Sequence, residues 1–265
     1  MADPVLPAWE GDPLSRFLSD AQRNERVSSL KMPDVYALLQ RVHVTFQQVG
    51  AITEKENNSS LLPTLFLMAR AHAAWLASVR LGLSAQTVEA YPVVRVVIED
   101  AWYALHLAKD PSPPARVEVW LNRDDDAAAE AQCAAEFSIK NVRRTHAALD
   151  PTTEAVCHTV YKRTIGLGGH PNERGVLTAM TRTDTGEALT FGAVYLTNDP
   201  VLIAAVLKTA VEAAVGALKT FRLIFPERFT IMGVDGDVEK LVGGLNAVFK
   251  TVHDLRHRCR EWRDI

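Results

Sequence analysis

The stretch "DPVLIAAVLKTAVEAAVGALKTFRLIF", residues 199–225, is typical of a long helix at the centre of a packed protein. Asn198 and Pro200 provide a start signal for it. Lys208, Glu212 and Lys219 share one face of this helix, and the other side carries small residues, Ala210, Ala213, Ala214 and Ala217. Small side chains let a neighbouring helix approach closely, so we expect this face to pack within the chain or across a twofold axis in a homodimer.

Helical periodicity continues on both sides of this stretch. It predicts helices over residues 14–30, 33–49, 61–81, 84–109, 115–122, 125–149, 150–164 and 237–264. Ser84 is placed to cap the helix that follows it. The polar segment 53–60 has no apolar residue and indicates a linker. We therefore expect peripheral N-terminal helices in residues 1–58 and a main helical bundle in residues 60–265, within one domain overall.

The periodicity changes after the glycines at 166, 168 and 169. The segments "GVLTAMTRT" and "EALTFGAV" are rich in threonine and apolar residues around "DTG", which predicts a β-hairpin at about 176–194. Short connections favour antiparallel neighbouring helices. The predicted fold class is all-α, an antiparallel helical bundle with one inserted β-hairpin.

Composition limits the classes of function. Hydrophobic residues make up 48% of the 265 residues and charged residues 23%, as in ordinary globular proteins. A net charge of −3 gives no overall attraction to RNA. The best apolar stretches carry Arg70, His72, Arg95 or Glu99 in their middles, and the N-terminus has no basic leader before an apolar run. We expect no membrane span and a cytoplasmic protein.

Metal and cofactor motifs give weak signals. Cys133, Cys157 and Cys259 are widely spaced and form no C-x-x-C pair. The segment "HDLRH", residues 253–257, resembles H-E-x-x-H, but aspartate replaces the glutamate and arginines surround it. We therefore expect no metal and no cofactor.

Polar residues in apolar helices are the first candidate ligand-binding residues. His72 lies in an apolar stripe, where its ring needs a hydrogen-bond partner. Arg95 and Glu99 are one helical turn apart, with Tyr103 at the margin of the same arc. A core histidine and a surface ion pair worth about 0.3–0.5 kcal/mol are the alternative interpretations.

The segment "YKRTIGLGGHPNERG", residues 161–175, supplies the second group of candidates. Arg163 and His170 flank the glycines, so a cation and a proton-transfer group come within reach of one ligand if the loop folds back. Its backbone amides are suited to cradle an anion. A turn with His170 and Asn172 as local caps is the alternative.

The order of "RVVIEDAWYAL" and "YKRTIGLGGHPN" resembles bacterial all-helical proteins near the HEPN superfamily, over residues 60–225. Many HEPN proteins are metal-independent endoribonucleases or toxin components that act as dimers. The resemblance implies that Arg163 stabilises the charged phosphorane-like state and that His170 moves a proton. Two features differ from the family pattern: Thr164 follows the arginine, and His170 precedes proline in a glycine-rich loop.

Two functional hypotheses follow from these residues. The favoured one is a non-catalytic binding module in which His72, Arg95, Glu99, Tyr103, His170 and Asn172 surround a polar pocket for a small molecule or a partner protein. The other is a HEPN-like endoribonuclease or toxin-type nucleotide-processing enzyme with Arg163 and His170 as catalytic residues.

Overall fold

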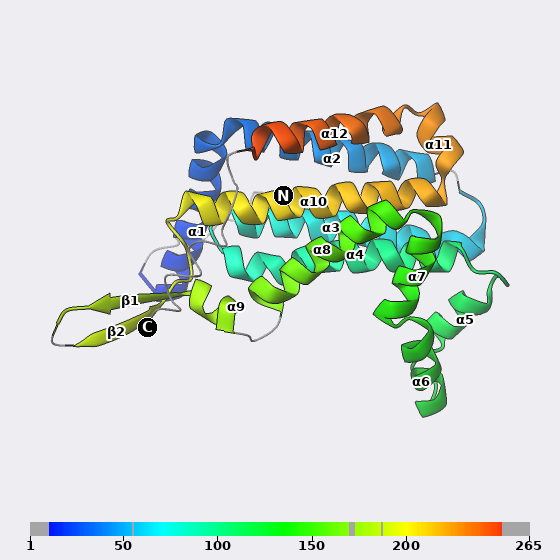
Figure 1. Ribbon diagram of the computed structural model, residues 1–265, viewed down its shortest axis with the longest axis horizontal. Coiled ribbons are helices and arrows are strands. Elements are labelled where there is room, and N and C mark those ends of the chain that lie inside the picture. The colour runs from blue at the N-terminus through cyan, green and yellow to red at the C-terminus, as the bar shows by residue number, and fades with distance from the viewer. Residues whose placement is uncertain (1–10, 55, 170–172, 187, 251–265) are drawn as a thin grey trace, which may run out of the picture.

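The computed structural model describes residues 11–54, 56–169, 173–186 and 188–250. It is an all-α bundle with one inserted two-stranded antiparallel hairpin (Figure 1). The elements are α1 (Pro13–Lys31), α2 (Pro33–Thr53), η1 (Ser59–Leu61), α3 (Leu62–Leu83), α4 (Thr87–Ala108), α5 (Ala115–Leu121), α6 (Ala127–Glu136), α7 (Ile139–Leu149), α8 (Pro151–Thr164), η2 (Ile165–Gly169), α9 (Glu173–Thr178), β1 (Met180–Asp184), β2 (Leu189–Ala193), α10 (Pro200–Ile224), α11 (Pro226–Ile231) and α12 (Val234–Val248).

Aspartate caps start several of these helices. The side chains of Asp12, Asp126, Asp150 and Asp199 accept hydrogen bonds from backbone amides of α1, α6, α8 and α10. Each cap satisfies amides that have no partner within the first helical turn. Proline also occupies the first turn of α1, α8 and α10, where its missing amide proton costs nothing.

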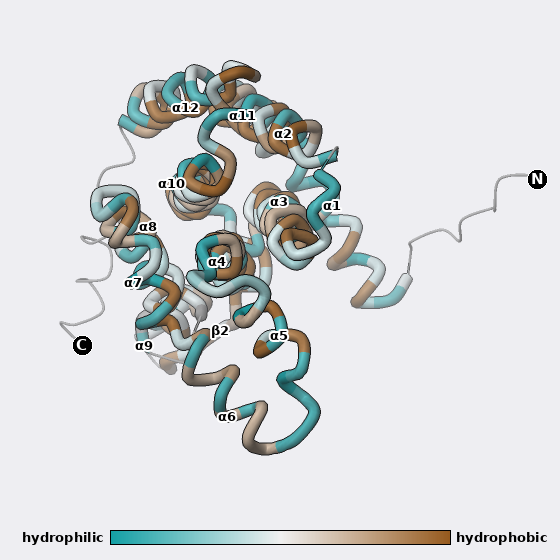
Figure 2. Tube along the Cα trace, turned by 90° about the vertical axis from the view of Figure 1, so that its right-hand side faces the viewer, coloured by the Kyte–Doolittle hydropathy of each residue, from teal (hydrophilic) through white to brown (hydrophobic). Residues whose placement is uncertain are grey.

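Helix α10 is the central element. It contacts α2, α3, α4, α8 and α12, which surround it in the end-on view of Figure 2. Its alanine face is buried within the single chain, with Ala210, Ala213, Ala214 and Ala217 at most 1% exposed. Gly216 extends this face: a Cβ atom there would lie 2.6 Å from the sulfur of Cys157 on α8. Small residues therefore let α10 pack closely inside the bundle.

Helix α10 is long and apolar enough to cross a membrane by length and composition, whereas the sequence predicted no apolar stretch of that length. Of its most apolar stretch, 78% is buried inside the bundle. A central core helix satisfies the same length and composition test, so this property is a weak indication of membrane insertion.

Helices α3 and α4 form an extensive antiparallel pair beside α10. Trp75 and Trp102 are at most 1% exposed and fill the space around this pair. Helix α2 contributes Leu38, Val42 and Phe46 to the same core cluster, so it is an integral part of the bundle. Helix α1 buries only Ala21 and Ser28 among its residues and lies at the edge.

Helices α5 and α6 project from one end of the bundle (Figure 1). Arg116 on α5 fixes this projection, because it donates to the backbone carbonyls of His106 (2.8 Å) and Lys109 (3.0 Å). Its Nε atom also donates to Glu136 at the end of α6 (2.7 Å). One arginine therefore joins the end of α4 to both helices of the projection.

The predicted single helix over 125–149 was wrong, since α6 ends at Glu136 and α7 begins at Ile139. Ser138 caps α7 by accepting from the amide of Asn141 (3.4 Å). The Tyr103 hydroxyl donates to the carbonyl of Phe137 at the break (2.8 Å). A side chain from another helix therefore stabilises the interruption, and local periodicity does not register such a contact.

Other predicted boundaries also need correction. The hairpin is shorter than 176–194, because residues 173–178 form α9 and the strands span only 180–193. Ser84 does not cap α4; its hydroxyl donates to the carbonyl of Leu81 (2.9 Å). Pro226 starts α11, and the last described helix begins at Val234, three residues before the predicted start at 237. The helix ends at Val248, so the predicted continuation is not found at 249–250; residues 251–264, which include the "HDLRH" segment, lie outside the described residues.

Candidate functional site

The strongest candidate site is the line of contact between α4 and α8, formed by Arg95, Glu99, Tyr103 and Tyr161, which we call the α4–α8 seam. Arg95 and Glu99 form an ion pair along α4, with 3.4 Å between Nε and Oε1. Both side chains are 27% exposed. They are therefore partly withdrawn from water while still accessible to a small solute.

Tyrosine side chains border this ion pair. Tyr161 on α8 packs its ring against Trp102, with 5.3 Å between ring centroids. Burial and the adjacent Glu99 carboxylate raise the pKa of Tyr161 above its usual value. The same two causes raise the pKa of Tyr103. Both phenols are therefore neutral at physiological pH, and the Tyr161 hydroxyl is hydrogen-bonded to Glu99 within the seam.

Tyr103 lies at the edge of the seam. Its hydroxyl is occupied by the Phe137 carbonyl, and its ring stacks on Phe137 with 5.3 Å between centroids. In this arrangement its first role is structural, since it fixes the junction of α6 and α7. It provides the seam with an aromatic wall.

Arg163, one of the two predicted catalytic residues, is directed toward α10. Its guanidinium forms an ion pair with Glu212 and lies 3.5 Å from the Thr209 hydroxyl. Lys208 lies 3.5 Å from the same Glu212 carboxylate. Arg163 is therefore held by an acidic partner on α10, and a phosphate group would have to compete with Glu212 for the guanidinium.

The glycine segment before His170 is a helical turn with a kink at Gly168, whose φ of 176° and ψ of −17° are not helical. Residues 165–169 continue α8 as a π-helical turn, η2, in place of a flexible loop. Pro92 on α4 has no amide proton to donate to the carbonyl of Val88. Gly168 packs onto that carbonyl so closely that a Cβ atom would lie 2.3 Å from its oxygen. The proline and the glycine together hold η2 against α4. His170 and Asn172 lie outside the described residues.

His72 belongs to a different cluster. Its Nε2 atom lies 3.0 Å from Nδ1 of His43 on α2, and its ring stacks on Phe46 with 4.7 Å between centroids. Burial and the neighbouring His43 lower the pKa of His72 to about 4. These contacts come from α2, whereas the α4–α8 seam is built by α4 and α8. The described residues therefore place His72 apart from Arg95, Glu99 and Tyr103.

Sequence reasoning did not identify a buried polar network at the junction of α4 and α7. Trp102 donates its indole N–H to Nδ1 of His146 (3.0 Å). His106 contacts the hydroxyl of Thr145 (2.7 Å) and the carboxylate of Glu136 (3.1 Å). Both histidines are at most 1% exposed, and burial lowers their pKa values. Their position in helical stripes was the available signal, but their partners are distant in sequence.

Asp100 is a buried carboxylate whose partner the helical periodicity did not indicate. Its nearest cation is Arg70 on α3, with 3.7 Å between Nε and Oδ2. Burial raises the pKa of this carboxyl to about 6, while Arg70 opposes the rise. Asp100 faces α3, so it lies away from the seam.

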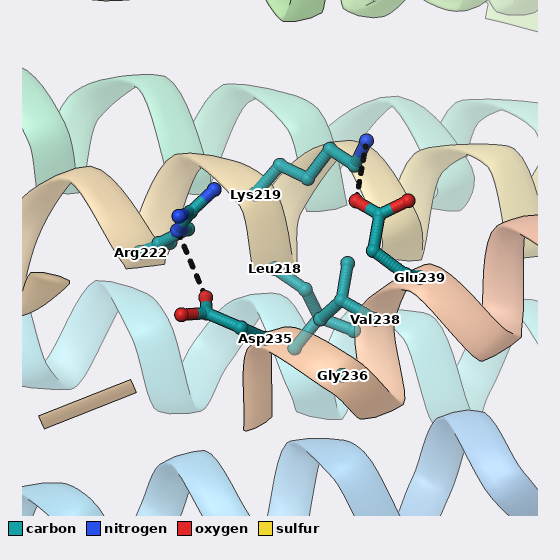
Figure 3. Close-up of a pocket in the computed structure, with 7 residues that line it drawn as sticks. All are labelled: Leu218, Lys219, Arg222, Asp235, Gly236, Val238 and Glu239. Atoms are coloured by element: carbon teal, nitrogen blue, oxygen red, sulfur yellow. Dashed lines mark ion pairs between the residues drawn. The ribbon is translucent and has the colours of Figure 1, made fainter. Parts of the chain in front are cut away.

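A cavity of about 210 Å³ lies between α10 and α12. Figure 3 shows that two ion pairs flank it, Arg222 with Asp235 (2.8 Å) and Lys219 with Glu239 (3.4 Å). These side chains neutralise one another across the helix pair. They are consistent with a structural contact that fastens α12 to α10.

Within the described residues, no group of three or more His, Cys, Asp or Glu side chains is suited to hold a metal ion. Comparison of the chain with protein-family models, curated proteins and solved structures finds no match. The resemblance to HEPN-type proteins therefore remains a hypothesis.

Proposed function

We propose that the protein is a non-catalytic binding protein whose ligand site is the α4–α8 seam. The observation that carries this proposal is the half-buried pairing of opposite charges, Arg95 and Glu99, beside the phenol of Tyr161. A surface ion pair of this spacing contributes little to stability. Its partial burial beside aromatic rings is better explained by a ligand that uses both charges.

The ligand that fits this chemistry is a small polar molecule with an anionic group and a hydrogen-bond donor. Arg95 would bind the carboxylate or phosphate in a bidentate manner. Glu99 would accept a hydrogen bond from the donor group of the ligand, and Tyr161 would contribute both a ring face and a hydroxyl. The native ion pair keeps the two groups oriented before the ligand arrives, which lowers the cost of ordering them.

The test is isothermal titration calorimetry of the full-length protein with the proteinogenic amino acids and the common ribonucleoside monophosphates. For a probe that binds, Glu99→Gln should weaken affinity about tenfold or more, because a charged hydrogen bond is worth about 1.5–3 kcal/mol. Glu25→Gln is the matched control. Glu25 is also 27% exposed and pairs with an arginine, Arg80, at 3.0 Å, but it lies on α1.

Two outcomes would contradict the proposal. Equal affinity in wild type and Glu99→Gln would remove the seam from the binding site. Absence of binding by every probe at millimolar concentration would rule out a small ligand of this class and leave a partner protein as the alternative.

The alternative function is a HEPN-like ribonuclease that uses Arg163 and His170. Arg163 is directed to Glu212 and Thr209 on α10, so this alternative requires its guanidinium to leave these partners and reach the RNA. An RNA cleavage assay decides between the two functions. Cleavage by wild type that is lost in both Arg163→Ala and His170→Ala would replace the binding proposal with the enzymatic one.

A further inference from the structure

The β-hairpin extends away from the helical bundle, beyond α9 (Figure 1). All residues of β2 are exposed, and so are Thr181, Thr183 and Asp184 on β1. An isolated two-stranded hairpin is marginally stable in water. This hairpin therefore has a backbone edge and side-chain faces available for a partner.

The register shows which backbone groups face outward. The amide of Val194 donates to the carbonyl of Ala179 (2.8 Å), and the amide of Thr185 donates to the carbonyl of Ala188 (3.1 Å). Hydrogen-bonded pairs alternate along an antiparallel ladder, so Thr181 pairs in this way with Gly192, and Thr183 with Thr190. The backbone amides and carbonyls of the intervening residues point away from the partner strand. On β2 these residues are Leu189, Phe191 and Ala193.

The two edges of the hairpin differ in charge. The β1 edge carries Arg182 and Asp184, whose side chains form an ion pair of 3.6 Å. The sequence of β2 is Leu-Thr-Phe-Gly-Ala and has no charge. Charged residues on an edge strand discourage pairing with another strand. The β1 edge is therefore protected, whereas the β2 edge is open.

We propose that two copies of the chain associate through their β2 edges to form a four-stranded antiparallel sheet. With a twofold axis at Phe191, the outward backbone groups of Phe191 in one copy meet those of Phe191 in the other. Leu189 of each copy then lies opposite Ala193 of its counterpart. All three side chains lie on one face of the strand, so the pairing brings apolar groups together across the axis.

The charge pattern favours a second copy over an unrelated extended peptide. The pairing places the uncharged strands in the middle and leaves the charged β1 strands as the outer edges of the new sheet. Two five-residue strands bury less than the roughly 1,600 Å² of a standard interface. We therefore expect a weak dimer with a dissociation constant in the micromolar range or above. This proposal does not depend on the ligand proposed for the α4–α8 seam.

Cysteine cross-linking tests the register in the full-length protein, in a Cys259→Ser background. Residues in a hydrogen-bonded antiparallel pair have Cα atoms about 5.5 Å apart, within the range that a disulfide spans. Phe191→Cys should therefore form a covalent dimer on mild oxidation. Leu189→Cys alone should not, but a mixture of Leu189→Cys and Ala193→Cys chains should form the mixed dimer. Equal cross-linking of Phe191→Cys and Leu189→Cys, or none in any of them, would overturn the proposal.

Sedimentation provides a measurement without introduced thiols. Wild type should show a concentration-dependent dimer, and Phe191→Lys should shift it to monomer by placing two like charges at the axis. Thr183→Lys is the control, since it adds the same charge on β1, away from the axis. Circular dichroism checks that each variant is folded. A monomeric wild type at several hundred micromolar, or a Phe191→Lys variant that dimerises like wild type, would contradict the β2 pairing.

Discussion

Gly216→Ala gives a quantitative test of how closely α8 and α10 pack. The new methyl group would lie 2.6 Å from the sulfur of Cys157, which is buried at 3% exposure. Overpacking of a core typically costs about 1–3 kcal/mol. Replacing glycine within a helix recovers about 1 kcal/mol of helix propensity. Because a 2.6 Å approach to a buried atom is far inside van der Waals contact, we take the upper part of this range, about 2–3 kcal/mol, and expect a net loss of about 1–2 kcal/mol in the free energy of unfolding.

A double-mutant cycle isolates the contact. Cys157→Ala removes the sulfur and leaves room for the methyl group, so in that background Gly216→Ala should stabilise the protein by up to about 1 kcal/mol. The coupling between the two positions should then be about 2 kcal/mol. Gly50→Ala on α2 is the control, because no atom lies within 4 Å of its Cβ position. It should leave stability unchanged or raise it slightly.

Urea unfolding followed by circular dichroism measures these differences as shifts of the midpoint at constant slope. A Gly216→Ala variant as stable as wild type would refute the packing argument. So would an equal effect of Gly216→Ala with and without Cys157.

Three further predictions concern buried polar groups. The free energy of unfolding should fall by about 1–2 kcal/mol as pH decreases from about 6.5 to about 4, because His72 stays neutral in the folded protein while the unfolded chain takes up the proton. Urea titrations at several pH values should show a smaller pH dependence for His72→Leu than for wild type. Asp100 has the opposite effect, because its raised pKa means that its charged form is disfavoured in the folded state, so Asp100→Asn should raise stability by about 1–2 kcal/mol at pH 8 but little at pH 4. Equal effects of Asp100→Asn at the two pH values in thermal melts would contradict this reasoning. Trp102→Phe should cost about 1–3 kcal/mol in chemical denaturation, since it leaves the buried Nδ1 atom of His146 without its donor; an unchanged midpoint would refute the importance of that bond.

The fold class and most helices could be predicted from the sequence because apolar periodicity records burial directly. The alanine face of residues 210–217 corresponds to the core-facing side of α10. Contacts between distant segments decided the features that were missed. The Tyr103 hydroxyl contacts the break at Phe137, and the turn at 165–169 packs through Gly168 onto the Val88 carbonyl of α4, four residues before Pro92.

The candidate site was less predictable than the fold. Periodicity placed Arg95 and Glu99 on one side of a helix, but it gave no information on which helix they would face. The approach of Tyr161 became apparent only when α8 was positioned against α4. In the same way, nothing near Arg163 in the sequence indicates Glu212, its partner on α10.

The late position of α10 in the chain has a consequence for protein synthesis. Helices α2, α3, α4 and α8 all precede it, and each of them uses α10 as a packing partner. While the ribosome is still extending the chain through residue 200, the apolar sides of these helices have no permanent cover. Exposed apolar surface on incomplete chains promotes aggregation. Nascent chains of this protein should therefore depend on chaperones until α10 has emerged, and truncation before Pro200 should yield insoluble fragments.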